Sequence, residues 1–201
     1  QRPTRRAAWF ASLCIYAWLS NPTFLYAQAN APAEPAVATQ AASLTAIQST
    51  MRRAVAIPDW VKLKEIKPQK LKSVYAMSMP LFDTQIYLDK SSTVFNRHIY
   101  TATQTAMLSR VANHDIVYFP EYQTLAIHRI RIVRGEEIID KTNSATIKLL
   151  QQEQALNSGI MTGAVNATVL VDDVRVNDEL EICYSIQGDN PVFAGKYATT
   201  K

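Results

Sequence analysis

Two segments near the end of the chain alternate between apolar and polar residues, as β-strands with one buried face do. The segment AVNATVLV places four apolar residues on one face, namely Val165, Ala167, Val169 and Val171. The segment ELEICYSI does the same with Leu180, Ile182, Tyr184 and Ile186. Asn177-Asp178 predicts a turn between the two segments, and the run from Gly188 to Pro191 predicts the end of the second.

A third strand is predicted around residues 124–134, with an irregularity in its middle. Leu125 and Ile127 alternate with polar residues, but Ile130 and Ile132 continue on the other parity. A slip of one residue inside a strand is the pattern of a β-bulge, here at His128-Arg129. The run Arg134-Gly135-Glu136-Glu137 then predicts a hairpin turn into a further short strand.

The remaining patterns complete an all-β assignment. Residues 93–108 are rich in threonine and aromatics and favour a strand, while residues 144–160 fit either a strand followed by a loop or a short helix ended by Gly159. Many short strands without βαβ alternation predict an antiparallel β-sandwich-like domain over residues 57–201. Residues 30–56 are expected to be a linker with a short helix, capped by Ser43, stopped by Pro58 and repeating Leu44, Ile47, Met51 and Val55.

The first 29 residues have the layout of a secretory signal. Three arginines precede an apolar run from Ala7 to Leu19, and Ala27-Gln28-Ala29 matches an A-x-A cleavage site. The sequence therefore predicts a signal peptide over residues 1–29 and a periplasmic or otherwise exported protein. The alternative is an uncleaved membrane anchor over residues 7–26, which would be the protein's contact with a membrane.

Charge changes the expected partners. The chain has a net charge of +4, and removal of Arg2, Arg5 and Arg6 would leave +1, so nucleic-acid binding loses its main support. A lysine-rich stretch, WVKLKEIKPQKLK, could contact an anionic surface such as lipid or a cell-wall polymer, or could be a solvated connector. We favour the solvated connector. The stretch contains five lysines: Lys62, Lys64, Lys67, Lys70 and Lys72.

Cys183 is the candidate nucleophile, and its surroundings argue against that role. Cys14 lies in the predicted signal, so export would leave Cys183 without a disulfide partner. Its neighbours along the predicted strand are Glu179, Glu181 and Ser185. Negative charges raise the pKa of a thiol, and a mid-strand position offers no helix N-terminus to lower it. We therefore expect an ordinary sheet cysteine and no catalytic residue.

Other side chains with chemical potential do not form a known pattern. His98, His114 and His128 are not at metal-binding spacings, and His114 is expected in a loop. The acid pairs Asp172-Asp173 and Glu136-Glu137 could hold calcium but are expected to be exposed turn residues, so no metal or cofactor is predicted. Four aromatic residues either line a sugar- or peptide-binding groove or, as favoured, close the ends of the core: Trp60, Tyr118, Phe119 and Tyr122.

Several stretches together resemble a bacterial family, domain of unknown function 3857. They are IPDWV, YFPEYQTLAIHRIRIVRGEEIID, LNSGI and VLVDDVRVNDELEICYSIQGDNPVF, within residues 57–197. The chain departs from the family at Asn177, where a glycine is usual, and in its shorter Arg-Gly hairpin.

This resemblance implies an exported all-β domain that precedes a transglutaminase-like domain of the Cys-His-Asp kind, with no catalytic residues to carry over. The expected function is a non-catalytic accessory domain that orients a downstream catalytic domain or supplies substrate contacts to it. Its expected partner is that domain or another envelope protein. The alternative is a free-standing periplasmic module that binds a cell-envelope polymer or protein.

Overall fold

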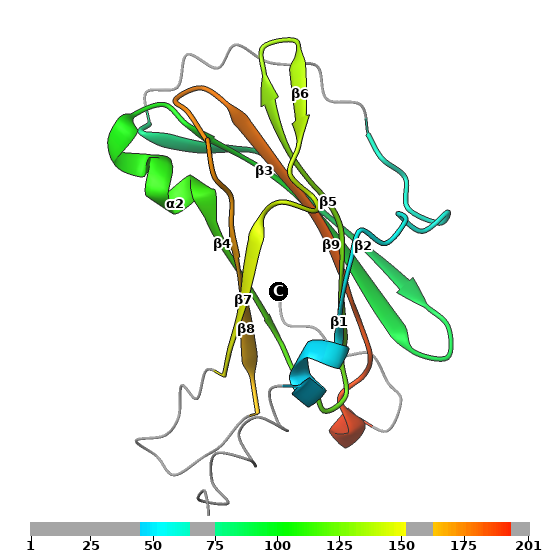
Figure 1. The fold of residues 1–201 in the computed structure, drawn as a ribbon. Coiled ribbons are helices and arrows are strands. Elements are labelled where there is room, and N and C mark those ends of the chain that lie inside the picture. Colours follow the sequence, from blue (N-terminus) through cyan, green and yellow to red (C-terminus); the bar gives the residue numbers. More distant parts are fainter. Residues whose placement is uncertain (1–44, 65–74, 152–162, 194–201) are drawn as a thin grey trace, which may run out of the picture. The chain divides into compact units, whose positions relative to one another are not determined.

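The computed structural model describes residues 45–64, 75–151 and 163–193, which form two β-sheets (Figure 1). The larger sheet, sheet A, has the strand order β1 (Met51–Arg53), β5 (Thr124–Arg134), β9 (Glu179–Gln187), β3 (Ser92–Ala102) and β2 (Met77–Leu88). The short strand β6 (Glu137–Asp140) pairs with β5 beyond this path. The smaller sheet, sheet B, has the order β4 (Asn113–Tyr118), β8 (Val165–Leu170) and β7 (Thr146–Gln151).

The two sheets bury their apolar faces against each other, so the predicted β-sandwich-like fold is confirmed. The alternating residues of β8, Val165, Ala167 and Val169, are buried in the same core cluster as Leu180 and Ile182 of β9. A single η1–α2 segment, with η1 at Thr105–Met107 and α2 at Leu108–Ala112, connects β3 of sheet A to β4 of sheet B. Val111 of α2 joins the core.

The strand β9 is buried on both faces. It lies between β5 and β3, so its inward residues Leu180 and Ile182 enter the core, while Glu181 and Cys183 on its other face are also buried. Residues 55–64 lie along that outer face of sheet A. They are held there by hydrogen bonds from His128 to the Val55 carbonyl, from Arg97 to the Lys64 carbonyl and between Gln85 and the Lys62 backbone.

The predicted irregularities of β5 and β9 are present. The register of β5 against β9 shifts between Ile127 and Arg129, which makes His128 the extra residue of a bulge. Arg134 pairs with Glu137 across a two-residue turn, where Gly135 has a φ of 63°. Asn177 adopts a φ of 69°, which an asparagine tolerates better than most residues. Local pattern was therefore sufficient to place these features.

The structure differs from the sequence prediction at the start of the domain. Among the described residues the helix covers 45–49, and Met51–Arg53 forms β1 instead of continuing it. β1 pairs with β5 in parallel, so sheet A is mixed and begins before residue 57. A strand that pairs with a distant partner can override a helical spacing this short.

Two further segments are now assigned. Residues 146–151 form β7, which decides the ambiguity there in favour of a strand. β3 ends at Ala102, and the helical residues η1 and α2 begin at Thr105, within the stretch that was expected to be strand. The predicted signal with Ala27 and Ala29, the anchor over 7–26, most of the linker, and Lys67, Lys70 and Lys72 lie outside the described residues. Within the described residues, no helix is long and apolar enough to cross a membrane.

Candidate ligand-binding pocket

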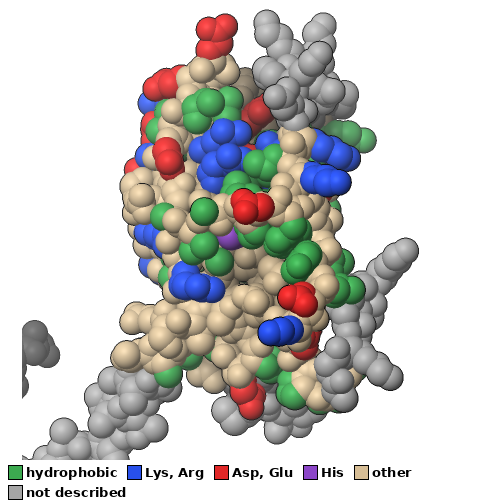
Figure 2. Space-filling model, turned by 90° about the vertical axis from the view of Figure 1, so that its right-hand side faces the viewer, with side chains coloured by type: hydrophobic (Ala, Val, Ile, Leu, Met, Phe, Trp, Pro, Cys, Tyr) green, Lys and Arg blue, Asp and Glu red, His purple; other side chains and the backbone are tan. Residues whose placement is uncertain are grey.

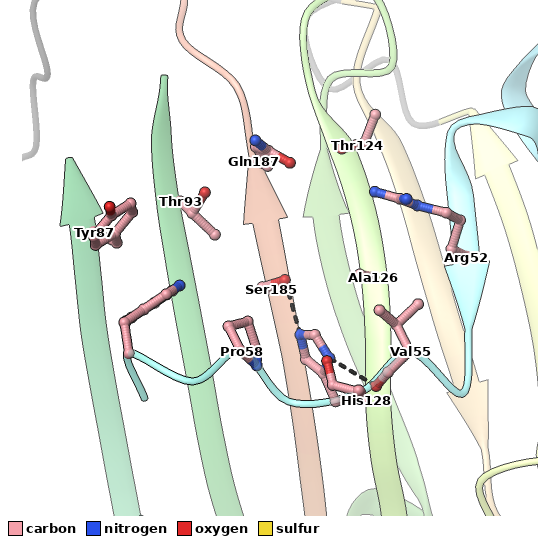
Figure 3. A pocket seen from close by; sticks show the side chains of 12 residues that line it. Arg52, Val55, Pro58, Tyr87, Thr93, Thr124, Ala126, His128, Ser185 and Gln187 are labelled. Atoms are coloured by element: carbon pink, nitrogen blue, oxygen red, sulfur yellow. Dashed lines mark hydrogen bonds between the residues drawn. The ribbon is translucent and has the colours of Figure 1, made fainter. Parts of the chain in front are cut away.

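A pocket of about 280 Å³ lies on the outer face of sheet A, between the sheet and residues 55–60. Side chains from β1, β5, β9, β3 and β2 and from this segment converge on it (Figure 3). The lining residues are Arg52, Val55, Ala56, Pro58, Trp60, Tyr87, Thr93, Thr124, Ala126, His128, Ser185 and Gln187. Ligand pockets usually have volumes of about 300–1,000 Å³, so this pocket is at the lower limit and suits a small ligand or the end of a longer one.

Strand register explains why these residues meet. Arg52, Ala126 and Ser185 are paired in turn across β1, β5 and β9, so they form one row across the sheet. The next row is formed by residues two positions further along each strand, paired in the order Thr124, Gln187, Thr93 and Tyr87. Because side chains two residues apart point to the same face, both rows line the pocket.

His128 and Ser185 form a hydrogen-bonded pair in this pocket. The Nδ1 atom of His128 lies 3.0 Å from the Val55 carbonyl oxygen and 3.1 Å from that of Ala56. Carbonyl oxygens only accept hydrogen bonds, so Nδ1 carries a proton and donates. Burial lowers the pKa of His128 despite these bonds, which keeps the ring neutral at pH 7. Nε2 then accepts a hydrogen bond from the Ser185 hydroxyl at 2.9 Å.

This pair resembles the nucleophile and base of a hydrolase, but its position argues for binding. β9 pairs on one side with β3 and on the other with β5, and Ser185 has a partner in both. The backbone N–H groups around Ser185 are therefore committed to the sheet. An acyl-transfer site needs free N–H donors beside its nucleophile to stabilise the oxyanion. The geometry favours Ser185 as a hydrogen-bonding group toward a ligand.

The aromatic residues singled out in the sequence do not gather in one groove. Tyr118 is fully buried in the core, and Phe119 stacks on Tyr122 with ring centroids 5.4 Å apart. Trp60 alone of the four lines the pocket, where it stacks on Tyr87 at 5.3 Å. Tyr87 was missed in the sequence because its place beside Trp60 depends on the path of residues 55–64 across the sheet.

Arg52 brings a positive charge to the pocket. Its side chain is exposed, and among the described residues it makes no hydrogen bond or ion pair. Figure 3 shows its guanidinium directed across Ala126 toward the other lining residues. By contrast, the neighbouring Arg53 donates to the backbone carbonyls of Asn143 and Ala145. Arg53 is therefore a structural residue, while Arg52 is available to a ligand.

A cluster of arginines lies further along the same face. Arg97, Arg129 and Arg131 all form ion pairs with Glu181, whose side chain is 1% exposed. Burial alone would raise the pKa of Glu181, but these three charges outweigh it and lower the pKa. Figure 2 shows lysine and arginine side chains gathered on this side of the molecule. Glu181 neutralises part of the charge of the three arginines. Because these residues come from β3, β5 and β9, the ion pairs connect neighbouring strands, and the cluster has a structural role.

Cys183 lies within this cluster and is not activated. Its thiol is fully buried, and its Sγ is 4.0 Å from an Nη2 of Arg129. Burial, with Glu181 as a further cause, raises the pKa of Cys183 to about 11 despite that arginine. The expectation that a nearby glutamate raises this pKa therefore agrees with the structure, although burial is the larger cause.

The other candidate residues are accounted for by ordinary contacts. Asp172 pairs with Lys141, and Asp173 pairs with Arg134 and Arg175, while Glu136 and Glu137 are exposed in the hairpin. His114 lies in β4 rather than in a loop, with its ring 5.6 Å from that of His98. Within the described residues, no group of three or more histidine, cysteine or acidic side chains could hold a metal ion. Lys62 and Lys64 are exposed.

Comparison with known proteins identifies related sequences and folds. The sequence model of the family described as "Domain of Unknown Function with solved-structure structure (DUF3857)" matches residues 89–201. No curated protein matches the chain.

Among solved structures, a "putative protease" from Parabacteroides distasonis ATCC 8503 is 20% identical, with a TM-score of 0.49, over 57% of this chain and 23% of that protein. The chain thus spans about a quarter of the length of that protein. The CBM3a-L domain of the Clostridium thermocellum scaffoldin cipA is 10% identical with a TM-score of 0.37, over 57% of this chain and 68% of that one. A family IIIa CBD from Clostridium cellulolyticum is 16% identical with a TM-score of 0.38, over 57% and 73%.

Proposed function

The chain belongs to the DUF3857 family, and on this premise we propose that it is a non-catalytic accessory domain of an exported, transglutaminase-like protein. Its role is to supply substrate contacts to a downstream Cys-His-Asp domain through the pocket on sheet A. Export places the protein in the periplasm or outside the cell.

The single observation that carries this proposal is the position of the pocket at the end of β9. Gln187 lines the pocket and is the last residue of β9, and the chain then runs through Gly188 to the short helix η3 (Pro191–Phe193). The described chain thus leaves β9 beside the pocket. This supports a role in which a ligand held in the pocket also contacts a domain further along the sequence.

The chemistry of the pocket supports binding rather than catalysis by this domain. Its lining combines hydroxyl and amide groups with an aromatic pair. Outside the pocket lining, the buried thiol of Cys183 has a pKa of about 11. Such a thiol is almost entirely protonated at neutral pH and is a poor nucleophile. A transferase reaction would therefore need a cysteine from another domain.

The first test is the coding sequence beyond the codon for Lys201. We expect an open reading frame with a cysteine at the start of a predicted helix and a histidine and an aspartate in later strands. A stop codon directly after Lys201 would overturn the accessory-domain proposal.

The second test uses the longer protein and its thiol-dependent activity on envelope peptides. Tyr87→Ala removes one wall of the pocket, and we expect it to raise KM about tenfold with kcat unchanged, because it removes binding shared by substrate and transition state. Val117→Ala, on the exposed face of sheet B, is the matched control. A KM that stays unchanged in Tyr87→Ala would show that the pocket does not contact the substrate.

A free-standing binding module is the second candidate. It is favoured by the exposure of Lys62 and Lys64, which follow the pocket residue Trp60 on the segment that crosses sheet A. Two exposed cations beside a pocket would attract an anionic envelope polymer. This candidate predicts salt-sensitive binding of the chain alone to envelope material, weakened by the double substitution of Lys62 and Lys64 by glutamine.

A further inference from the structure

The charge distribution of the pocket specifies one end of its ligand. Among the described lining residues, Arg52 is the one that carries a charge, and none is acidic. His128 is neutral because burial lowers its pKa. An exposed guanidinium without an ion pair is a preferred partner for a carboxylate, which it can bind with two parallel hydrogen bonds.

The hydrogen bond between Ser185 and His128 specifies a second contact. The hydroxyl proton of Ser185 is directed to Nε2 of His128, because the carbonyls of Val55 and Ala56 hold the proton of the ring on Nδ1. The Ser185 oxygen can therefore only accept a hydrogen bond from a ligand, so the matching group on the ligand is an N–H or O–H donor.

The distance between these two contacts is short. Arg52 on β1 and Ser185 on β9 both pair with Ala126 of β5, which lies between them. Their Cα atoms are therefore two strand spacings, about 10 Å, apart. The long Arg52 side chain reaches back over Ala126, whose methyl group leaves room for a ligand (Figure 3). A donor and a carboxylate on the same terminal residue can then contact both groups.

We propose that this pocket binds the C-terminal end of a peptide, with the terminal carboxylate on Arg52 and the last amide N–H donated to Ser185 Oγ. This inference rests on the proposed role of the pocket in supplying substrate contacts and names the class of substrate. The preceding residues of the peptide extend over the second row, where Thr93 and Gln187 provide hydrogen-bonding groups. Small apolar side chains fit against Val55, Ala56 and Pro58.

Two observations favour a peptide end over related ligands. A free amino acid would place its ammonium group in a pocket that has Arg52 and no acidic residue among the described lining, so an acylated nitrogen is preferred. A sugar acid would need an open aromatic face to stack on. Trp60 already stacks on Tyr87 at 5.3 Å with an interplanar angle of 19° and meets Phe95 edge-on, so these rings offer less free surface to a pyranose.

The first experiment measures binding of N-acetyl-Ala-Ala-Ala and of its C-terminal amide to the 201-residue chain by calorimetry. We expect the free acid to bind at least tenfold more tightly than the amide. Arg52→Gln should reduce the affinity for the acid to that for the amide and leave the amide unaffected. Lys148→Gln, an exposed cation on β7 of sheet B and outside the pocket lining, should change neither. Equal affinities for acid and amide, or an unchanged Arg52→Gln, would overturn the proposal.

A depsipeptide tests the second contact. Replacement of the last amide N–H by an ester oxygen should weaken binding several-fold in the parent chain and have no effect in Ser185→Ala, whose fold is checked by its circular dichroism and thermal midpoint. An equal loss in both proteins would exclude the Ser185 contact. Tighter binding of N-acetylmuramic acid than of the peptide would assign the pocket to sugar acids instead. These outcomes do not depend on the coding sequence after Lys201, so failure here is distinct from failure of the accessory-domain proposal.

Discussion

At the scale of single residues, the chemistry of Cys183 is decided by opposing neighbours. Burial and the charge of Glu181 raise its pKa, while Arg129 and Arg97 act in the opposite direction. The net result is a pKa of about 11 for a thiol enclosed between β3 and β5. Because the thiolate is the reactive form, both the low thiolate fraction and the lack of access slow any reaction of this cysteine.

We therefore predict slow alkylation of Cys183 in the folded protein. At pH 8 a thiol with a pKa near 11 is about one-thousandth ionised, so iodoacetamide should react on the order of a hundredfold or more slower than with the same residue in urea. The rate is followed on the peptide that contains Cys183, by mass spectrometry, in a Cys14→Ser background. Rapid labelling in the folded state would contradict the pKa and restore the nucleophile hypothesis.

The sequence predicted part of this environment. Glu181 is two residues from Cys183 on the same face of the strand, so its effect on the thiol was visible from alternation alone. The three arginines that surround Glu181 come from β3 and β5, and their approach depends on which strands are neighbours. The same reason hid the pair of His128 and Ser185, whose residues are 57 positions apart.

At the scale of elements, the stability of the domain depends on β9 more than on the edge strands. It pairs with β3 and β5 over most of its length, and its inward residues meet sheet B in the core. Gly188 at its end also lies against the backbone of Tyr122, where a Cβ would come within 1.9 Å of the carbonyl oxygen. Substitutions in β9 should therefore affect the whole sandwich.

Ile182→Ala is predicted to lower the free energy of unfolding by about 2–5 kcal/mol. Ile182 is fully buried between the sheets, so truncation removes apolar contacts and leaves a cavity. Urea denaturation followed by circular dichroism measures the change. Val117→Ala on the exposed face of β4 is the control and should cost less than about 0.5 kcal/mol. If the two substitutions cost the same, the assignment of the inward face of β9 is wrong.

Elements whose signals are local were predictable, and those that depend on distant partners were not. The bulge at His128 and the hairpin at Gly135 follow from parity and turn residues within a few positions. β1 was expected to be helix, because Met51 fits a helical spacing and nothing nearby in the sequence indicates its partner β5. The pocket was missed for a related reason: residues 55–60 have no regular pattern and acquire their role only by crossing sheet A.

At the scale of the whole molecule, two buried histidines, His98 and His128, and the half-buried His114 link stability to pH. Burial lowers the pKa of His98, His114 and His128, and for His114 the value is about 4, with the nearby His98 as a further cause. The unfolded chain binds protons at these residues below about pH 6.5, whereas the folded protein resists protonation until lower pH. Folding is therefore favoured above pH 6.5 and progressively disfavoured as the pH falls from there toward 4.

We predict that the free energy of unfolding falls by about 2.5 kcal/mol between pH 7.5 and 4.5 because of His114 alone, since its pKa drops from about 6.5 to about 4 on folding. Urea midpoints at pH 7.5, 6.5, 5.5 and 4.5 measure this. His114→Phe keeps an aromatic ring beside Tyr100 and Tyr184 and should flatten the profile, whereas the exposed-strand variant Lys148→Gln should not. Folding lowers the pKa of some carboxylates, such as that of Glu181, and these groups lose their stabilising contribution mainly below about pH 4, the ordinary range of carboxyl pKa values. Most of the change in the free energy of unfolding between pH 7.5 and 4.5 therefore comes from the histidines. A profile as steep in His114→Phe as in the parent would show that His114 is not held neutral by the core.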